Sequence, residues 1–250
     1  MKTVRIGCAG WSLGSAHKAH FPAEGTQLER YAAVFNAVEI NSSFYRPHRP
    51  ETYRRWSASV PGDFRFAAKL PRSITHEHRL AGTTALLDKF LAEVGALGAS
   101  LGVLLIQLPP SLAYAEDRAG AFLRTLRERH AGGLCLEPRH ASWFSAAAES
   151  LLDEYRVARV GADPALNAAA AVPGGGAGPR YTRLHGSPRM YWSDYGPEQL
   201  QAVARRLRAE QAAGADSWCI FDNTAAGHAL GNALELRRLL RTAAAGGDPS

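Results

Sequence analysis

The chain has 250 residues, of which 46% are hydrophobic and 21% charged, and its formal net charge is +6. This length suits one large hydrophobic core, and the absence of any apolar run of about 18 residues excludes a membrane-spanning helix by sequence. Cys8, Cys135 and Cys219 are odd in number and widely spaced, which argues against a disulfide framework and a zinc knuckle. We therefore expect one soluble domain without a membrane partner, located in the cytoplasm.

Short apolar segments alternate with amphipathic segments along the whole chain. The apolar segments predict strands at residues 4–7, 38–41, 64–69, 101–108, 134–139, 158–163, 181–185 and 218–223. Apolar residues at three-to-four spacing predict helices at residues 27–36, 50–59, 83–98, 116–130, 145–155, 197–211 and 225–240. Eight strands that alternate with helices over this length predict an α/β fold, a (β/α)8 TIM-type barrel.

One connection departs from this alternation. Residues 167–179, between the sixth and seventh strands, are rich in Ala, Gly and Pro and have no amphipathic pattern. We expect the helix between these strands to be reduced or missing. The barrel is expected to fill residues 1–242 as a single domain, with a disordered tail at residues 243–250.

Polar residues gather at the C-terminal ends of the predicted strands, where barrels of this type hold their active sites. Because side chains alternate along a strand, the period of two predicts which of them face inward. The predicted inward residues are Glu39, Asn41, Lys69, Gln107, Glu137, Arg139, Asp163, Arg183 and His185. At the last strand either Asp222 or Asn223 faces inward, and the pattern does not decide between them.

Acidic and basic residues would therefore meet in one bowl, where each needs a partner because an unpaired desolvated charge is costly. One interpretation is an ion-pair belt that closes the barrel. The other is a functional site, which the recurrence of polar residues at one end of strand after strand favours.

Several ordered blocks resemble the signature of one family. They are Gly7-x-x-Gly10-Trp11, residues 38–45, residues 64–71, Ile74-Thr75-His76, residues 107–111, Glu137-Pro138-Arg139-His140-x-x-Trp143-Phe144 and Arg183-Leu184-His185-Gly186. Through these blocks the chain resembles the DUF72 (YecE-like) family from residue 6 to about residue 239. The resemblance implies a TIM-type barrel, loosely grouped with sugar-isomerase-like proteins, without an established reaction. The chain departs from the family at Asp222, where Asn is commoner, and at Pro138, where a bulky apolar residue is usual.

The bowl suits acid–base chemistry, since two groups in different environments can have separated pKa values. The candidate catalytic residues are Glu39, Lys69, Glu137 and Asp163. We expect an isomerase- or hydrolase-like enzyme that acts on a small anionic carbohydrate or a nucleotide-derived substrate. The alternative is a nucleic-acid-binding protein or a metal-dependent phosphodiesterase, for which the basic surface and loop aromatics would be used.

A ring of further residues is expected to bind the substrate. They are Trp11, Asn41, Tyr45, His76, Gln107, Arg139, Trp143, Arg183, His185 and Asn223. Lys69, Arg139 and Arg183 predict an oxyanion ligand, because guanidinium groups suit bidentate recognition of such ions. No cofactor is expected and no residue is assigned as a metal ligand, although a divalent ion held by these carboxylates and histidines stays open. The oligomeric state is not predicted.

Overall fold

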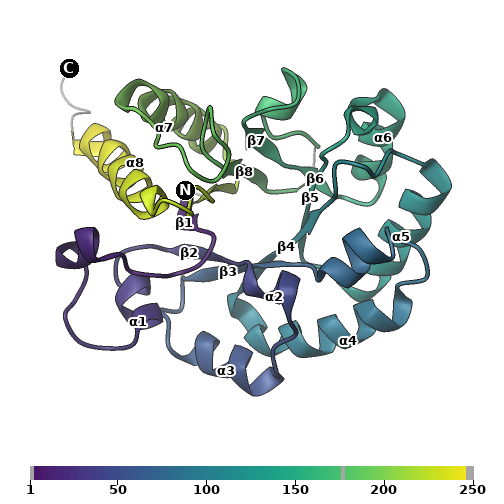
Figure 1. Cartoon of the computed structure of the whole chain (residues 1–250), viewed down its shortest axis with the longest axis horizontal. Coiled ribbons are helices and arrows are strands. Elements are labelled where there is room, and N and C mark those ends of the chain that lie inside the picture. The colour runs from purple at the N-terminus through teal and green to yellow at the C-terminus, as the bar shows by residue number, and fades with distance from the viewer. Residues whose placement is uncertain (1–2, 176–177, 246–250) are drawn as a thin grey trace.

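The computed structural model describes residues 3–175 and 178–245. Strands lie at its centre and helices surround them (Figure 1). The strands are β1 Arg5–Cys8, β2 Ala37–Ile40, β3 Arg65–Lys69, β4 Leu101–Gln107, β5 Gly133–Glu137, β6 Ala158–Arg159, β7 Gly161–Asp163, β8 Arg180–Leu184 and β9 Ser217–Phe221. The helices are α1 Gln27–Ala32, α2 Ser42–Tyr45, α3 Pro50–Ala58, α4 Thr84–Val94, α5 Glu116–Arg129, α6 Ala146–Glu154, α7 Pro197–Ala212 and α8 His228–Ala245.

All strands pair in parallel, in two sheets with the orders β1-β9-β8-β7 and β2-β3-β4-β5-β6. The sheets meet at two seams. At the first, Ala9 forms a parallel bridge with Glu39, and the Gly10 amide donates to the Glu39 carbonyl at 3.0 Å. At the second, Val160 separates β6 from β7 within the predicted sixth strand, and its amide still donates to Leu136 of β5 at 2.9 Å. The strands thus follow one another in sequence order, and the predicted (β/α)8 architecture is confirmed.

The core has two layers that follow the alternation of side chains along each strand. The outer layer lies between strands and helices. The inner layer fills the barrel with residues Ala37, Ala67, Val103, Leu105, Cys135, Ala158, Val160, Tyr181, Trp218 and Ile220. Tyr181 and Trp218 stack at 5.7 Å, and Gly102 makes room for them, since a Cβ there would lie 2.6 Å from the Trp218 ring. Polar residues that lie two positions beyond an inner-layer residue on the same strand therefore also face the inside of the barrel.

The predicted reduced helix between the sixth and seventh strands is confirmed. Only the 3-10 turn η5 (Ala169–Ala171) lies between β7 and β8 in the described part of this connection. The buried Arg159 side chain supports it, because its guanidinium donates to the carbonyls of Ala169 at 2.7 Å and Val172 at 3.2 Å. Arg159 also pairs with Glu149 of α6 and, through its backbone, with Gly174. One buried arginine therefore takes over part of the packing role of a helix.

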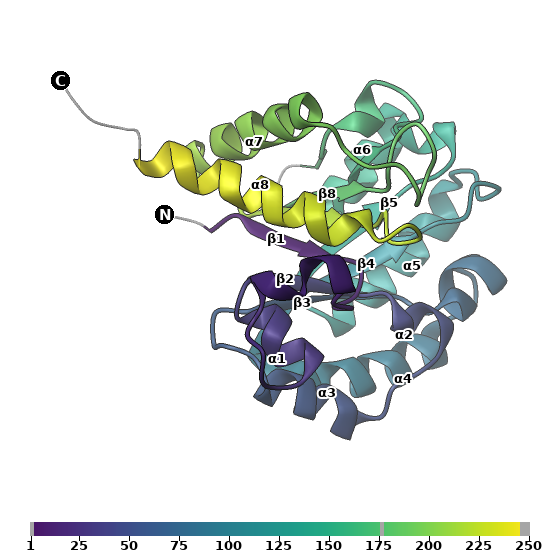
Figure 2. The same cartoon turned by 60° about the vertical axis from the view of Figure 1, so that its left-hand side comes forward.

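The ends of the chain differ from the prediction. Helix α8 lies beside α7 and β1 (Figure 2). It begins three residues later than predicted and continues through Ala245, past residue 242, where the barrel was expected to end. Residues 246–250 lie outside the described residues. None of the described helices is long and apolar enough to cross a membrane.

Candidate functional site

Five charged side chains meet at the C-terminal mouth of the barrel. Each lies two residues beyond an inner-layer residue in the same strand direction, which explains why it points inward. Their exposed fractions are between 0 and 6%. The residues are Glu39 after β2 residue Ala37, Lys69 of β3, Glu137 of β5, Arg183 of β8 and Asp222 after β9.

Arg183 is the centre of this group. Its Nε and Nη2 atoms donate to the two carboxylate oxygens of Glu39 at 3.0 and 2.6 Å. Its Nη1 donates to Glu137 Oε2 at 2.7 Å, and its Nη2 also donates to Asp222 Oδ2 at 2.8 Å. Burial alone would lower the pKa of Arg183, but these carboxylates raise it well above its ordinary value. Arg183 is therefore fully engaged by protein groups and holds the network together.

His185 and Arg139 complete the network on the Glu137 side. His185 lies between two carboxylates, with Nε2 2.8 Å from Glu137 Oε1 and Nδ1 3.0 Å from Asp222 Oδ2. Arg139 Nη2 lies 2.6 Å from the same Glu137 oxygen and 2.9 Å from His185 Nε2. Arg139 Nε is buried and has no acceptor among the described residues. Arg139 Nε–H is thus a donor without an acceptor within the described structure.

Two carboxylates of this network, Glu137 and Asp222, stay ionised. Burial alone would raise the pKa of Glu137, but Arg183, Arg139 and His185 hold it well below its usual range. The pKa of Asp222 is lowered in the same way: burial opposes the shift, and Arg183 and His185 outweigh it. Neither group is protonated near neutral pH, so neither suits the role of a general acid.

Lys69 is the buried cation without an ionic partner. Its ammonium group lies 4.1 Å from the centre of the Phe44 ring, and no hydrogen bond or ion pair to it occurs among the described residues. Burial and, after it, the nearby Arg183 lower the pKa of Lys69 from 10.5 to about 8, against the opposing effect of the carboxylates. The Ser43 hydroxyl donates to the Lys69 carbonyl at 2.7 Å and fixes the backbone below it. Lys69 can therefore exist as a neutral amine near physiological pH.

The prediction that Asp163 faces the bowl is wrong. In the β7–β8 register Ala162 lies opposite Arg183, while Asp163 lies opposite Leu184 of the outer layer. The Asp163 carboxylate accepts a hydrogen bond from the Tyr195 hydroxyl at 2.7 Å, away from the charged network. The sixth strand carries small residues on both faces here, so its sequence pattern did not mark the inward one.

The last strand resolves the choice that the sequence left open. Trp218 and Ile220 belong to the inner layer, so Asp222 faces inward and Asn223 outward. Asn223 is buried and donates to the Ser193 carbonyl at 2.9 Å and to Asn232 at 2.8 Å. Asn223 therefore anchors the loop after β8 to α8, and Asp222 brings a carboxylate into the bowl.

The other predicted binding residues divide into four groups, of which the last, Trp11 and Asn41, lines a cavity. Trp143 is buried and donates to the Leu112 carbonyl at 2.9 Å, so it anchors a loop. Gln107 and His76 are partly buried at the mouth, and His76 packs edge-on against Phe44 with ring centres 4.9 Å apart. Tyr45 is 68% exposed at the rim.

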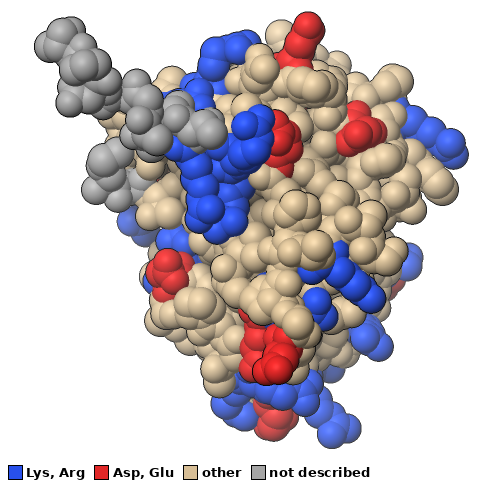
Figure 3. Space-filling view, turned by 90° about the vertical axis from the view of Figure 1, so that its left-hand side faces the viewer, with Lys and Arg blue, Asp and Glu red and all other residues tan. Residues whose placement is uncertain are grey.

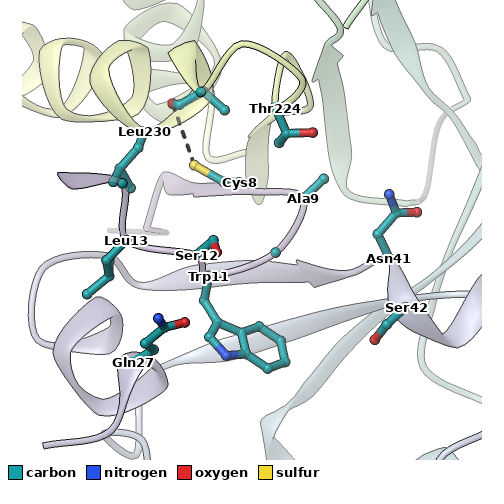
Figure 4. A pocket seen from close by; sticks show the side chains of 14 residues that line it. Cys8, Ala9, Trp11, Ser12, Leu13, Gln27, Asn41, Ser42, Thr224 and Leu230 are labelled. Carbon is teal, nitrogen blue, oxygen red and sulfur yellow. Dashed lines mark hydrogen bonds between the residues drawn. The ribbon is translucent and has the colours of Figure 1, made fainter. Parts of the chain in front are cut away.

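Trp11 and Asn41 line a cavity of about 490 Å³ beside the charged network. The loops after β1 and β9 enclose it, with Asn41 and Thr224 on one side and Leu13 and Gln27 on the other (Figure 4). Cys8 also borders it, but its thiol donates to the Ala229 carbonyl at 3.5 Å, and burial raises the pKa of Cys8 to about 12. Cys8 is thus a structural thiol and no nucleophile.

Two features of the site escaped the sequence argument. Phe44, which contacts Lys69, lies on the short helix α2 that no periodicity predicts. The segment after His185 folds back over the network, so that Tyr191 packs against His185 at 5.6 Å and Met190 Sδ lies 3.6 Å from Arg139 Nη1. The only sequence signal for these roles was the gathering of aromatic residues after strand ends.

Within residues 3–175 and 178–245, no group of three or more His, Cys, Asp or Glu side chains is arranged to hold a metal ion. Glu39, Glu137 and Asp222 each face Arg183 instead.

The fold and the site define a (β/α)8 barrel protein with a charged site at the C-terminal face of its strands. The family model described as "Protein of unknown function DUF72" matches residues 5–249, and the chain belongs to this family. The resemblance inferred from the motifs is thereby confirmed.

Curated relatives and solved structures agree with this assignment. UPF0759 protein YecE of Escherichia coli K12 is 33% identical over 147 residues, 58% of this chain, and the chain spans about half of its length, 52%. UPF0759 protein YunF of Bacillus subtilis 168 is 23% identical over 95% of this chain and 94% of its own. A crystal structure of a DUF72 family protein from Thermotoga maritima has a TM-score of 0.76 at 23% identity, covering 95% of this chain and 99% of that one. The apo structure of the 3-keto-D-glucoside 4-epimerase YcjR from E. coli has a TM-score of 0.58 at 15% identity, covering 96% and 100%.

Proposed function

We propose that this protein is an enzyme that moves a proton on a small anionic carbohydrate, as an isomerase or epimerase does, with Lys69 as the base. The observation that carries the proposal is the buried Lys69 amine, unpaired among the described residues at the end of β3. A general base works best when its pKa lies near the operating pH, and the pKa of Lys69 is lowered to about 8.

In the proposed reaction the neutral Lys69 amine takes a proton from a carbon atom next to a substrate carbonyl. The electron pair moves onto the carbonyl oxygen and forms an enolate. In isomerisation the Lys69 ammonium returns the proton to the neighbouring carbon on the same face, while the proton of the neighbouring hydroxyl passes to the former carbonyl oxygen. In epimerisation a water molecule on the opposite face supplies the new C–H proton, and Lys69 gives its proton to solvent. The free Nε–H of Arg139 is suited to donate to the enolate oxygen or to an anionic substituent. The remaining network keeps Arg139 oriented, since Glu137 binds its Nη2 at 2.6 Å.

Hydrolysis by a pair of carboxyl groups is less well supported. That mechanism needs one protonated carboxylic acid beside the bond that breaks. Burial alone would raise the pKa values of Glu137 and Asp222, but Arg183 lowers them. Both groups therefore remain ionised and cannot supply that acid. Proton transfer by Lys69 requires no such acid.

The likeness to YcjR supports the choice of substrate class. That barrel is described as a 3-keto-D-glucoside 4-epimerase, and its likeness to this chain covers 96% of this chain at a TM-score of 0.58. An epimerase of this kind inverts a carbon atom of a sugar unit, which is within the range of the proton transfer proposed here.

The proposal is tested by hydrogen exchange in D2O. Aldonates, uronates and sugar phosphates are incubated with the wild-type protein, and proton NMR follows loss of the signal next to the carbonyl. Wild type is expected to exchange at least one of them, and Lys69→Met is expected to lose exchange by at least about a thousand-fold. The matched control is Lys18→Met, on the exposed turn η1 (Ser15–His20), which should exchange at the wild-type rate. Equal exchange by Lys69→Met and wild type would refute the role of Lys69.

The alternative of nucleic-acid binding has one specific observation in its favour. Tyr45, Tyr191 and Trp192 are 68%, 39% and 46% exposed, and Arg189 lies 4.5 Å above the Trp192 ring. On the face seen in Figure 3, however, basic side chains are interspersed with acidic ones and do not form a continuous track. Binding of single-stranded DNA that weakens steeply with salt and is lost in Trp192→Ala would favour this alternative.

A further inference from the structure

The cavity lined by Trp11 and Asn41, beside the charged network, is large enough to hold a further unit of the substrate. We propose that this cavity binds an uncharged glycosyl unit that is joined to the anionic unit at Lys69 and Arg139. The substrate would then be a glycoside or disaccharide acid and not a free monosaccharide acid. The identity of the reacting unit depends on the proposed function, whereas the glycosyl site depends on the cavity alone.

The position of the cavity follows from the strands that carry the network. Asn41 lies two residues beyond Glu39, at the start of α2 just after β2 ends, and Thr224 lies two residues beyond Asp222, in the turn after β9, so both line the cavity from segments that follow network residues directly. Ala9, which bridges to Glu39, borders the cavity as well. A ligand in the cavity therefore lies beside the segments that carry Glu39 and Asp222, and the proposal places the unit joined to it at Lys69.

The chemistry of the lining matches a neutral polyol. Among the described residues, no Asp, Glu, Lys, Arg or His side chain lines the cavity. Hydroxyl and amide groups do so instead, from Ser12, Gln27, Asn41, Ser42 and Thr224. Asn41 Oδ1 is buried and has no hydrogen-bond partner in the described structure. An unsatisfied buried acceptor favours a ligand that can donate to it, and a sugar hydroxyl can both donate and accept.

Size and shape agree with one sugar ring. The volume of about 490 Å³ lies within the usual range of small-ligand pockets, roughly 300–1,000 Å³. Leu13, Leu230 and Trp11 add apolar surface for the C–H face of a ring. Trp11 is the one aromatic side chain of the lining and packs edge-on against Trp56 at 5.0 Å, so the described residues offer no pair of aromatic faces for a nucleobase.

Calorimetry with paired ligands tests the inference. Gluconate is compared with maltobionate, cellobionate and lactobionate, each of which is gluconate bearing one neutral hexosyl unit. At least one of the three is expected to bind about ten-fold or more tightly than gluconate. Adenosine monophosphate serves as the nucleobase probe.

Two mild variants connect any gain to the cavity. Thr224→Val keeps the side-chain shape and removes the hydroxyl, and Asn41→Leu removes the amide. Each is expected to reduce the hexosyl gain to below about three-fold, with circular dichroism melts that show a folded protein. The matched control is Thr125→Val on α5, whose hydroxyl bonds only within its own helix, to Ala121 at 2.8 Å, and which should keep the full gain.

The outcomes separate this inference from the proposed function. If no hexosyl gluconate binds more tightly than gluconate, or if the gain survives in both cavity variants, the glycosyl site is refuted. If adenosine monophosphate alone binds more tightly than gluconate, and both variants remove this difference, a nucleobase site would replace the glycosyl site. If the hexosyl gain is present but no substrate exchanges protons in D2O, the cavity assignment stands and the proposed function fails.

Discussion

Arg183 and Glu39 face each other across the barrel mouth through two parallel hydrogen bonds of 3.0 and 2.6 Å. Arg183 belongs to the sheet of β1, β9, β8 and β7, whereas Glu39 belongs to the sheet of β2 to β6. Both side chains are at most 1% exposed. This ion pair therefore joins the two sheets at the end where the charged site lies.

Removal of Arg183 should destabilise the protein strongly. Arg183→Met leaves Glu39, Glu137 and Asp222 buried with less compensating charge, and we expect a loss of about 3–5 kcal/mol in the free energy of unfolding. Urea denaturation followed by circular dichroism measures it. Arg54→Met, which breaks the exposed pair with Glu51 in α3, should lose less than about 1 kcal/mol. Equal small losses in both variants would show that the network contributes little to stability.

Acid should weaken the fold through Glu137. Arg183 and Arg139 hold its pKa below the ordinary value of 4.5 against the effect of burial, so its stabilising contribution is present above pH 4.5 and is lost as the pH falls through the lower folded-state value. The free energy of unfolding of wild type should fall as pH decreases below about 4.5, and that of Glu137→Gln should fall less steeply. Parallel pH profiles for the two proteins would contradict this assignment. Glu137→Gln should also be destabilised at pH 7, because the buried guanidinium of Arg183 then loses one of the carboxylates that balance its charge.

Lys69→Met should stabilise the protein at pH 7 while removing activity. The pKa of Lys69 is about 8 in the folded state and 10.5 when unperturbed, so the buried ammonium opposes folding below pH 8. The variant is expected to gain about 1–3 kcal/mol at pH 7, and the gain should vanish above pH 10.5. Thermal melts across this pH range measure it, with Lys18→Met as the exposed control. A destabilised Lys69→Met at pH 7 would mean that Lys69 has an attractive structural role.

The barrel could be predicted from the sequence because its signals repeat. Eight apolar segments and their intervening amphipathic segments lie at the predicted places, and the Ala-, Gly- and Pro-rich connection after the sixth strand lacks a full helix. The short helix α2 and the π-helical turn Ser73–Glu77 were not predicted, since four or five residues give no measurable periodicity. These two turns nevertheless place Phe44 and His76 beside Lys69.

The inward residues were predictable wherever a strand has large residues on one face. Phe66 and Ala67 fix the orientation of Lys69, and Cys135 fixes that of Glu137. The alternation of side chains did not predict the orientation of Asp163, because Gly161 and Ala162 are both small and give no contrast between the two faces of the strand. The sequence could also not show that Arg183 is fully engaged and Lys69 unpaired, since this depends on distances between side chains from different strands.

Activity should depend on pH through the base. If the neutral amine of Lys69 accepts the proton, kcat/KM for the exchanged substrate rises with pH and levels off above about 8. A rate that is constant between pH 6 and about 9, or that falls over this range, would exclude Lys69 as the base.

The protonation of Lys69 can be measured directly, without a known substrate. The sequence contains four lysines, Lys2, Lys18, Lys69 and Lys89, so protein labelled with 13C-lysine gives few side-chain signals, and Lys69→Met identifies the one from Lys69. In an NMR titration we predict that the Lys69 signal changes with a midpoint near pH 8, well below the ordinary lysine value of 10.5. A Lys69 midpoint at or above 10.5 would contradict the account, because the amine would then be charged at the pH at which it must accept a proton.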